Sequence, residues 1–364
     1  MIQGFKAVAF RADASLDIGT GHVMRCLTLA DGLAERGVHC LFLTRSRRGD
    51  FIKIITQRGH VAFPLSNLEN NETIKSTDKV DWLGVDWQQD AEECYSALSK
   101  KVDWLIVDHY GIDARWENHL SERATKIMVI DDLADRPHVA NVLVDQNLVA
   151  NMQGRYNKLV PAGCTQLIGP TYALVRPEFE ALRKPSLLRR ETASLDHILI
   201  FMSGADIGNE TCKVVMGLSR SRLASCAVDI VVGASFPFLK ELRNLVKTMS
   251  RAQIHVQTSN MAELMASADL AITAGGSATW EKCVVGLPSI VEIMSENQKE
   301  AAMQMHYQGA QLTLGWSTKL TPHDFTHIIN NINIEQMRNM SIVSRQICDG
   351  SGVSKVISCM ELLS

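Results

Sequence analysis

Short apolar runs alternate with amphipathic stretches along almost the whole chain, and this alternation is the feature that most constrains the fold. In the first half the runs are residues 7–10, 38–43, 60–63, 104–107, 126–130 and 141–144. Their composition is typical of strands that are buried on both faces of a sheet. Strands that alternate with helices predict parallel βαβ units, and hence an α/β fold.

The alternation lapses over residues 172–195, which are charged and contain prolines, and then restarts. The second series predicts strands at 197–202, 229–232, 253–256, 270–273 and 289–293, with helices at 210–219 and 236–249. A chain of 364 residues is long enough to form two cores. We therefore expect two Rossmann-like domains, 1–171 and 196–364, which face each other across a cleft. We expect 172–195 to be a linker with a helical turn or two, and the last helix is a candidate to pack back on the first domain.

Charge and cysteine content exclude several classes of protein. A formal net charge of −3 gives no field that would gather nucleic acid or an anionic membrane, and the basic run Arg45, Arg47 and Arg48 is expected to be a solvated loop. The nine cysteines are scattered without a CxxC pair, so we expect neither a disulfide framework nor a zinc site. The chain shows no signal-peptide pattern at its start and no apolar run of the roughly 18 residues that a membrane span needs. We expect a cytoplasmic protein without stable membrane association.

The first candidate site follows the first expected strand, where residues 19–22 read Gly-Thr-Gly-His and a helix begins. Gly19 and Gly21 allow a tight turn, and the first free N–H groups of the helix favour a phosphate. The third glycine of a dinucleotide-binding loop is missing, so an NAD site is disfavoured. His22 is the candidate base beside the ligand. Asp13 is a candidate substrate contact or, alternatively, a turn former.

A second candidate site lies in the second half, where Gly275, Gly276 and Ser277 separate an expected strand from a helix. Adjacent glycines let backbone N–H groups close on a diphosphate, and Glu281 could accept hydrogen bonds from both hydroxyls of a ribose. Alternatively, Glu281 is only a favourable charge near a helix N-terminus. Together with the His22 turn, this segment predicts a nucleotide diphosphate in the cleft.

Three further stretches leave alternatives open. Asp108, at the end of an expected strand, is either functional or a helix cap. Adjacent side chains on a strand end point in different directions, so Asp131 and Asp132 make a poor metal site, and we expect no metal. The turn at 203–208 either contacts the ligand or caps the following helix.

These motifs resemble, in order along nearly the whole chain, the UDP-2,4-diacetamido-2,4,6-trideoxy-β-L-altropyranose hydrolases of pseudaminic acid biosynthesis. The matching segments read RADASLDIGTGHVMRCLTLADGL, VDHYGID, VIDDLADRPHVANVLVDQN, AGGSATWEKCVVGLPSIV, ENQ and CDGSGVSKV. The resemblance implies a GT-B fold, related to the glycosyltransferase that adds N-acetylglucosamine in peptidoglycan synthesis. The turn at 203–208 departs from the family, which more often has two glycines followed by Asp-Pro.

The resemblance also assigns roles to individual residues. It implies that His22 is the catalytic base and that substrate contacts come from Gly21, Asp13, Tyr110, Asn297 and Gln298. It further implies that Gly275, Gly276, Ser277 and Glu281 bind the nucleotide.

The activity implied is hydrolysis of the UDP-sugar with inversion. His22 would take a proton from the water that attacks the anomeric carbon, and UDP would leave. Helix N-termini and N–H groups around Gly275 can stabilise the leaving group, so no metal or other cofactor is expected. Two alternatives stay open: a glycosyltransferase that uses a sugar or lipid acceptor, and a non-catalytic protein that binds the same small-molecule UDP-sugar. The sequence indicates no oligomeric state.

Overall fold

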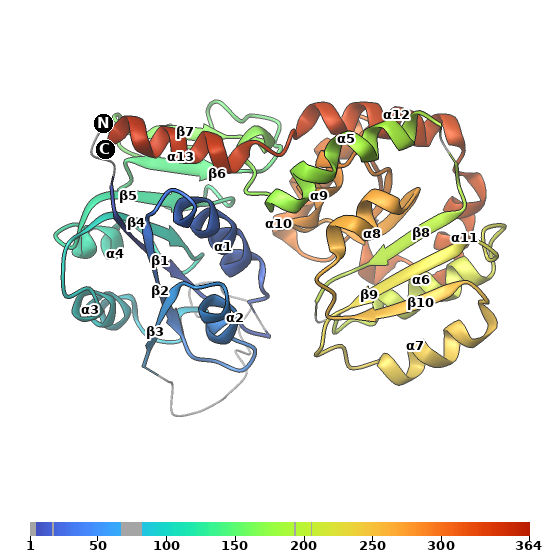
Figure 1. Cartoon of the computed structure of the whole chain (residues 1–364), viewed down its shortest axis with the longest axis horizontal. Helices are drawn as coiled ribbons and strands as arrows, with labels where there is room; N and C mark the ends of the chain where they lie inside the picture. The colour runs from blue at the N-terminus through green and yellow to red at the C-terminus, as the bar shows by residue number, and fades with distance from the viewer. Residues whose placement is uncertain (1–4, 17, 67–81, 193, 205) are drawn as a thin grey trace. The chain divides into compact units, whose positions relative to one another are not determined.

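The computed structural model describes residues 5–16, 18–66, 82–192, 194–204 and 206–364. The chain forms two compact units, each with its own parallel sheet (Figure 1). Unit 1 comprises Met1–Asn147, Asn151–Leu174 and Ser351–Ser364. Unit 2 comprises Leu148–Ala150 and Val175–Gly350.

The described part of unit 1 contains a seven-stranded sheet in the order β3-β2-β1-β4-β5-β6-β7. Its strands are β1 (Ala7–Ala12), β2 (His39–Arg45), β3 (Val61–Leu65), β4 (Val102–Asp108), β5 (Ala124–Ile130), β6 (Val142–Asp145) and β7 (Thr165–Ile168). Every neighbouring pair is parallel. Each apolar run expected in the first half overlaps a strand, which confirms the interpretation as βαβ units. Strand β7 was not expected.

Helices cover both faces of this sheet. Helices α1 (Gly21–Ala34), α2 (Ile52–Gln57) and α13 (Gly352–Leu363) contribute to the core on one face, and α3 (Trp87–Ala97) and α4 (Ala114–Leu120) to the core on the other. Helix α1 presents an apolar stripe to the core, since Val23, Leu27, Ala30 and Leu33 are fully buried. Gly37, at φ 78°, follows the helix end.

Edge strand β3 is more exposed than expected. Val61 is 61% exposed and Phe63 is 43% exposed, so the prediction of burial on both faces is wrong for this strand. The reason is its place in the sheet, because β3 pairs on one side only, with β2.

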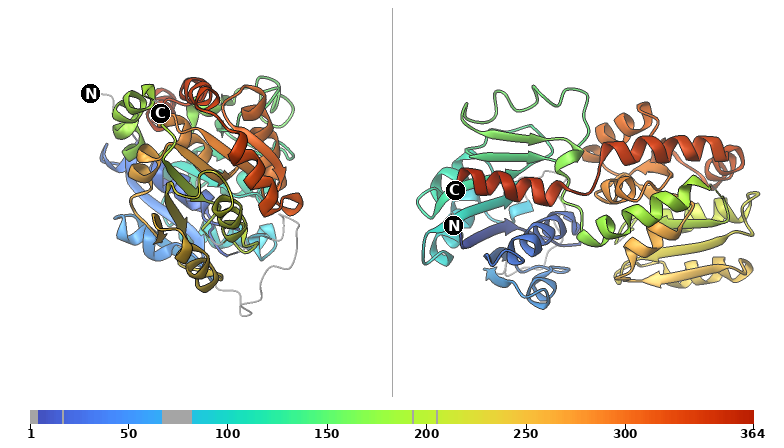
Figure 2. Two further views of the ribbon diagram at one scale, coloured as in Figure 1. Left: turned by 90° about the vertical axis from the view of Figure 1, so that its right-hand side faces the viewer. Right: turned by 45° about the horizontal axis from the view of Figure 1, so that its top comes forward.

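The last helix, α13, belongs to unit 1 (Figures 1 and 2). Its residues Val356, Ile357 and Met360 are fully buried in the same core as α1. The helix starts against the short 3-10 helix η2 (Pro170–Tyr172), where a Cβ on Gly352 would lie 2.1 Å from the carbonyl oxygen of Ala173. Only glycine fits this approach without movement of the backbone.

The sheet of unit 2 has six strands within the described residues, in the order β10-β9-β8-β11-β12-β13, and all pairs are parallel. The strands are β8 (His197–Phe201), β9 (Ala227–Val232), β10 (Ala252–Val256), β11 (Leu270–Ala274), β12 (Ser289–Ile293) and β13 (Leu312–Trp316). Only β13 lacks a counterpart among the expected runs, so the second Rossmann-like series is confirmed.

The helices of unit 2 form layers on both faces of the sheet. On one face lie α6 (Glu210–Ser219), α7 (Leu239–Leu245) and α11 (Pro322–Asn331). The remaining helices are α5 (Pro177–Glu191), α8 (Met261–Ser267), α9 (Ala278–Val284), α10 (Glu296–Tyr307) and α12 (Ile334–Ile347), with 3-10 turns η3 (Val246–Thr248) and η4 (Ser317–Lys319). Helix α6 has the predicted bounds, whereas the helix predicted at 236–249 divides into α7 and η3.

The expected linker at 172–195 is mostly the helix α5, so that expectation was wrong. The helix begins with Pro177, a residue suited to the first helical position, and buries Phe179. Its charged composition suggests a linker, but two of its arginines form hydrogen bonds inside the unit. Arg183 donates to the carbonyl oxygens of Val284 and Cys348, and Arg190 donates to that of Val285.

Candidate active site

The first group of candidate residues lies at the carboxyl ends of three neighbouring strands of unit 1. Strand β1 leads through residues 13–20 into α1, β4 ends at Asp108, and β5 is followed by Asp131 and Asp132. Helix α1 starts at Gly21, so His22 stands in its first turn, and Gly19 adopts the left-handed φ of 82° that the turn requires. His22 is 8% exposed.

His22 is held by Asp108, which lies 86 positions later in the sequence. Nδ1 of His22 is 2.6 Å from Oδ1 of Asp108. Arg25 Nη2 is also 3.3 Å from Nδ1, but it has its own acceptor, Asp108 Oδ1, at 2.7 Å. An ionised carboxylate only accepts hydrogen bonds, so the shorter contact assigns the proton to Nδ1. In the neutral imidazole with this tautomer, Nε2 carries the lone pair, and the described residues provide it with no hydrogen-bond partner.

Arg25 and Asp132 extend this arrangement to Tyr110. Arg25 follows His22 by three positions on α1, donates to Asp108 from Nε at 2.6 Å, and forms an ion pair with Asp132 at 3.1 Å. The Tyr110 hydroxyl donates to Oδ1 of Asp132 at 2.5 Å. The His22 and Tyr110 rings meet edge to face, with centroids 4.6 Å apart. The structure thus brings together two residues that the sequence singled out.

The charge state of Asp108 follows from its neighbours. Burial alone would raise its pKa, but the Arg25 guanidinium and His22 beside it hold the pKa well below the usual range. Asp108 is therefore ionised, and it can stabilise the imidazolium that forms when His22 accepts a proton. The capping role considered for Asp108 is not what the structure shows. The sequence offers one signal for its pairing with His22: Asp108 ends β4, and His22 stands in the first turn of the helix that follows β1.

Asp13 is not placed for direct contact with a ligand. It is fully buried, and both carboxylate oxygens accept hydrogen bonds from Arg11, at 2.6 and 2.9 Å. It also accepts from the backbone N–H of Arg45 at 2.7 Å, which ties the turn after β1 to the end of β2. The turn-forming alternative therefore fits better than the substrate contact.

Arg45 was expected in a solvated loop, and this expectation was wrong. Its side chain is fully buried and forms an ion pair with Asp90 at 2.6 Å. Asp90 also pairs with Arg11 at 2.7 Å, so two arginines and two aspartates neutralise one another beneath the turn.

The second group of candidate residues lies in unit 2, at the carboxyl end of β11. Gly275 and Gly276 follow this strand, and Ser277 precedes α9. The backbone N–H of Gly275 donates to the carbonyl oxygen of Glu292 in β12 at 3.1 Å. A Cβ on Gly276 would lie 3.9 Å from Nε2 of Gln298. The glycine turn and Gln298 therefore lie side by side.

Asn297 and Gln298 stand in the first turn of α10 and are partly engaged. Asn297 Oδ1 accepts from Ser295 Oγ at 2.6 Å, and Gln298 Oε1 accepts from the backbone N–H of Met294 at 3.0 Å. This bond directs the amide nitrogen of Gln298 toward the glycine turn. The Gln298 side chain can thus donate to a ligand held there.

Glu281 stands in the first turn of α9, and its Oε1 accepts from Nε of Arg176 at 2.9 Å. Both side chains are 17% exposed. Burial raises the pKa of Glu281, and the ion pair with Arg176 works in the opposite direction. Sequence reasoning missed Arg176 because it lies 105 positions before Glu281.

The turn at 203–208 caps a helix. Both carboxylate oxygens of Asp206 accept from backbone N–H groups at the start of α6, those of Glu210 at 2.9 Å and Thr211 at 2.8 Å. Ala205 lies outside the described residues. A Cβ on Gly233 would lie 1.9 Å from the carbonyl oxygen of Gly204, so this turn packs tightly on the segment after β9.

The described ranges contain no group of three or more His, Cys, Asp or Glu side chains that could hold a metal ion. Asp131 pairs with Arg136 at 2.9 Å, whereas Asp132 faces Arg25 and Tyr110. None of the described helices is both long and apolar enough to cross a membrane.

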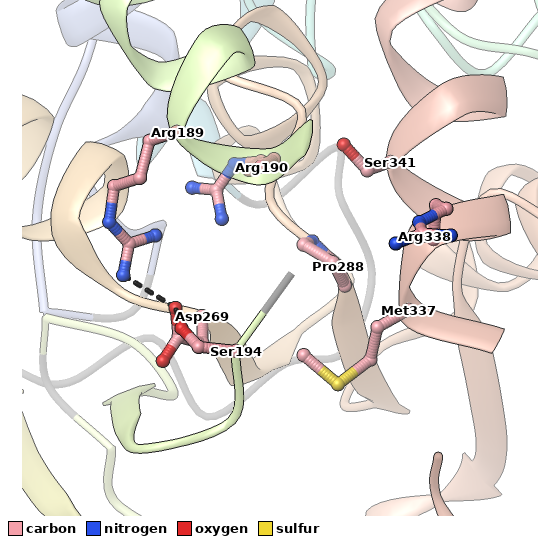
Figure 3. A pocket seen from close by; sticks show the side chains of 8 residues that line it. All are labelled: Arg189, Arg190, Ser194, Asp269, Pro288, Met337, Arg338 and Ser341. Atoms are coloured by element: carbon pink, nitrogen blue, oxygen red, sulfur yellow. Dashed lines mark hydrogen bonds and ion pairs between the residues drawn. The ribbon is translucent and has the colours of Figure 1, made fainter. Parts of the chain in front are cut away.

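A small open hollow lies at the opposite edge of the unit 2 sheet (Figure 3). Asp269 and Pro288, which line it, immediately precede β11 and β12. Arg189 pairs with Asp269 at 2.5 Å, and Arg190 donates to backbone carbonyl oxygens at the ends of α8 and α9. The hollow therefore belongs to the packing of α5 rather than to the candidate nucleotide site.

Comparison with solved structures identifies the fold class. Acinetobacter baumannii MurG has a TM-score of 0.69 at 14% identity and covers 98% of this chain and 99% of its own. Phytolacca americana UGT2, solved with UDP-2-fluoroglucose and pterostilbene, has a TM-score of 0.68 at 11% identity and covers both chains fully. The two parallel α/β units thus have the GT-B fold. Residues 211–348 match the glycosyltransferase family 28 C-terminal domain.

Comparison of sequences is more specific. The chain is 26% identical over 306 residues to the UDP-2,4-diacetamido-2,4,6-trideoxy-β-L-altropyranose hydrolase of Campylobacter jejuni, covering 84% of this chain and 98% of that protein. It is 24% identical over 359 residues to the spore coat polysaccharide biosynthesis protein SpsG of Bacillus subtilis, covering 97% of each. It is also 29% identical over 298 residues to protein MJ1062 of Methanocaldococcus jannaschii, covering 80% of this chain but 57% of that protein. The resemblance to the hydrolase inferred from the motifs is confirmed.

Proposed function

We propose that this chain is an enzyme that hydrolyses UDP-2,4-diacetamido-2,4,6-trideoxy-β-L-altropyranose to UDP and the free sugar, with inversion, as a step of pseudaminic acid biosynthesis in the cytoplasm. The similarity to the Campylobacter jejuni hydrolase supports the substrate. The observation that carries the chemistry is the 2.6 Å contact between His22 Nδ1 and Asp108, which in the neutral imidazole leaves Nε2 as the proton acceptor.

In the proposed reaction Nε2 of His22 removes a proton from water while the water oxygen attacks the anomeric carbon. The new C–O bond forms as the bond from that carbon to the UDP oxygen breaks, and UDP leaves with the bonding electron pair. Asp108 stabilises the resulting imidazolium, as the carboxylate does in Ser-His-Asp enzymes. Tyr110, held by Asp132, and Gly21 contact the sugar.

Unit 2 supplies the nucleotide contacts in this proposal. Gly275, whose own N–H stays bonded to Glu292, turns the chain so that the backbone N–H groups of Gly276 and Ser277 face the diphosphate and stabilise it as its charge grows, and no metal or other cofactor is required. Glu281 accepts hydrogen bonds from the ribose hydroxyls, and Asn297 and Gln298 contact the sugar side of the diphosphate.

A second candidate function is glycosyl transfer from the same donor. It is favoured by the match of residues 211–348 to the glycosyltransferase family 28 C-terminal domain. The same imidazole would then remove the proton from an acceptor hydroxyl instead of water. Release of UDP in the absence of any acceptor separates the two functions.

The test measures UDP release by the purified chain from a small panel of UDP-diacetamido-trideoxy hexoses, with no acceptor or added metal, and NMR identifies the sugar product. The wild type is expected to release a free reducing sugar from the L-altro substrate. His22→Asn should lower the rate roughly 10²- to 10⁴-fold, the usual contribution of a general base, with the Kd for UDP unchanged. His323→Asn, which changes an exposed histidine on α11, is the matched control. A fully active His22→Asn variant would exclude His22 as the base.

A further inference from the structure

Arg176 lies where the chain enters unit 2, immediately before α5, and it is fixed by three contacts. Its Nε donates to Glu281 Oε1 at 2.9 Å, and its Nη1 pairs with Glu178 Oε1 at 3.1 Å. The guanidinium carbon lies 5.0 Å from the centre of the Phe179 ring. A planar group held by two carboxylates and an aromatic ring has little rotational freedom.

The hydrogen bond from Arg176 leaves one oxygen of the Glu281 carboxylate, Oε2, available. Arg176 engages Oε1 alone, and the described residues offer Oε2 no hydrogen-bond partner, while the side chain stays 17% exposed. An ionised carboxylate has several acceptor positions on its two oxygens. Glu281 can therefore keep the bond to Arg176 and still accept hydrogen bonds from a ligand.

We propose that Arg176 is a positioning residue, which orients the Glu281 carboxylate to accept hydrogen bonds from the two ribose hydroxyls of the nucleotide; this inference rests on the proposed function. A ribose presents two adjacent O–H donors, and a carboxylate fixed on one side by a cation accepts both without reorienting. Arg176 itself need not touch the nucleotide. Its effect should therefore appear only for ligands that carry the ribose hydroxyls.

Calorimetric titration of the whole chain with UDP and with 2′,3′-dideoxy-UDP tests this role. Hydrogen bonds to a charged group predict that the wild type binds UDP about ten- to a hundredfold more tightly than the dideoxy analogue. Arg176→Gln should reduce this preference to about threefold or less, while the Kd for 2′,3′-dideoxy-UDP stays unchanged. Arg176→Lys keeps the charge without the guanidinium plane, so an intermediate preference is expected.

Two further variants complete the design. Glu281→Gln should lose the same preference, and the double variant Arg176→Gln/Glu281→Gln should lose no more than either single variant, because both act through one carboxylate. Arg243→Gln, an exposed arginine on α7 in the same unit, is the matched control and should keep the wild-type preference.

The outcomes separate this inference from the proposed function. Equal weakening of UDP and dideoxy-UDP by both Arg176 variants, with the preference retained, would show that Arg176 only stabilises the fold and would overturn the inference. A wild type that binds both nucleotides equally would remove Glu281 from ribose recognition and overturn it too, without affecting His22. A wild type that binds neither nucleotide would instead contradict the proposed function.

Discussion

Lys282 is a buried charge whose effect on stability can be calculated. It stands on α9 in unit 2 and is 2% exposed. Its Nζ donates to Thr273 Oγ1 at 2.7 Å, and the described residues provide it with no carboxylate partner. Burial lowers its pKa from 10.5 to about 8. The folded state therefore disfavours the charged form of this side chain.

The magnitude follows from linkage. A fall from 10.5 to about 8 corresponds to about 3 kcal/mol of free energy. Below pH 8 both the folded and the unfolded state are protonated, so the destabilisation is fully present. Between pH 8 and 10.5 the folded state releases its proton first, and the destabilisation fades as the pH rises. Lys282→Met removes the charge and keeps the shape, at a cost of about 1 kcal/mol for the lost hydrogen bond.

Lys282→Met should therefore raise the free energy of unfolding by about 2 kcal/mol at pH 7, and the gain should disappear by about pH 10. Urea unfolding followed by circular dichroism at both pH values measures it. Lys240→Met, an exposed lysine on α7, is the control and should change neither value. A Lys282→Met variant that is less stable than the wild type at pH 7 would refute the reasoning, because it would show that the ammonium group is well paired.

Two further predictions concern the His22 pair and the last helix. Asp108→Asn removes the anionic acceptor of His22 Nδ1, so UDP release should fall roughly 10²- to 10⁴-fold without a change in the Kd for UDP; an unchanged rate would show that His22 needs no orienting partner. Gly352→Ala forces a Cβ against the Ala173 carbonyl oxygen and should cost about 1–3 kcal/mol in urea unfolding, whereas Gly163→Ala, in open space, should cost much less. Equal losses in the two glycine variants would contradict the proposed close packing of α13.

The interior strands could be predicted from sequence because each is buried on both faces and therefore reads as a continuous apolar run. The strands that were missed, β7 and β13, lie at sheet edges, and their sequences TQLI and LTLGW mix polar and apolar residues. An edge strand has a neighbour on one side only, so its composition carries a weaker signal. Helix α5 was missed for a related reason, since its arginines bind backbone carbonyl oxygens inside the unit.

The candidate site was predictable only as far as local motifs reach. His22 and the glycine turns can be recognised because the residues that form each motif are adjacent in sequence. The partners of His22 depend on strand order, because Asp108 reaches it only where β4 lies beside β1, and Asp132 only where β5 lies beside β4. Strand order is set by the packing of the whole sheet. The same limit explains why the sequence presents Asp13 as a candidate substrate contact, since its burial against Arg11 cannot be inferred from composition.

The presence of a charged partner, more than burial, decides whether Asp108, Lys282 and Glu281 carry a charge. Asp108 and Lys282 are both almost completely buried, and burial alone disfavours the charged form of each. Asp108 nevertheless stays ionised because Arg25 holds it through two charge-assisted bonds, whereas Lys282, with only a neutral hydroxyl as its partner, is pushed toward neutrality. Glu281 lies between these cases, since a single bond from Arg176 opposes its burial without reversing the direction of its pKa change. Removing Arg176 therefore leaves the largely buried Glu281 carboxylate without a neutralising charge, because no other cation in the described part of the chain pairs with it.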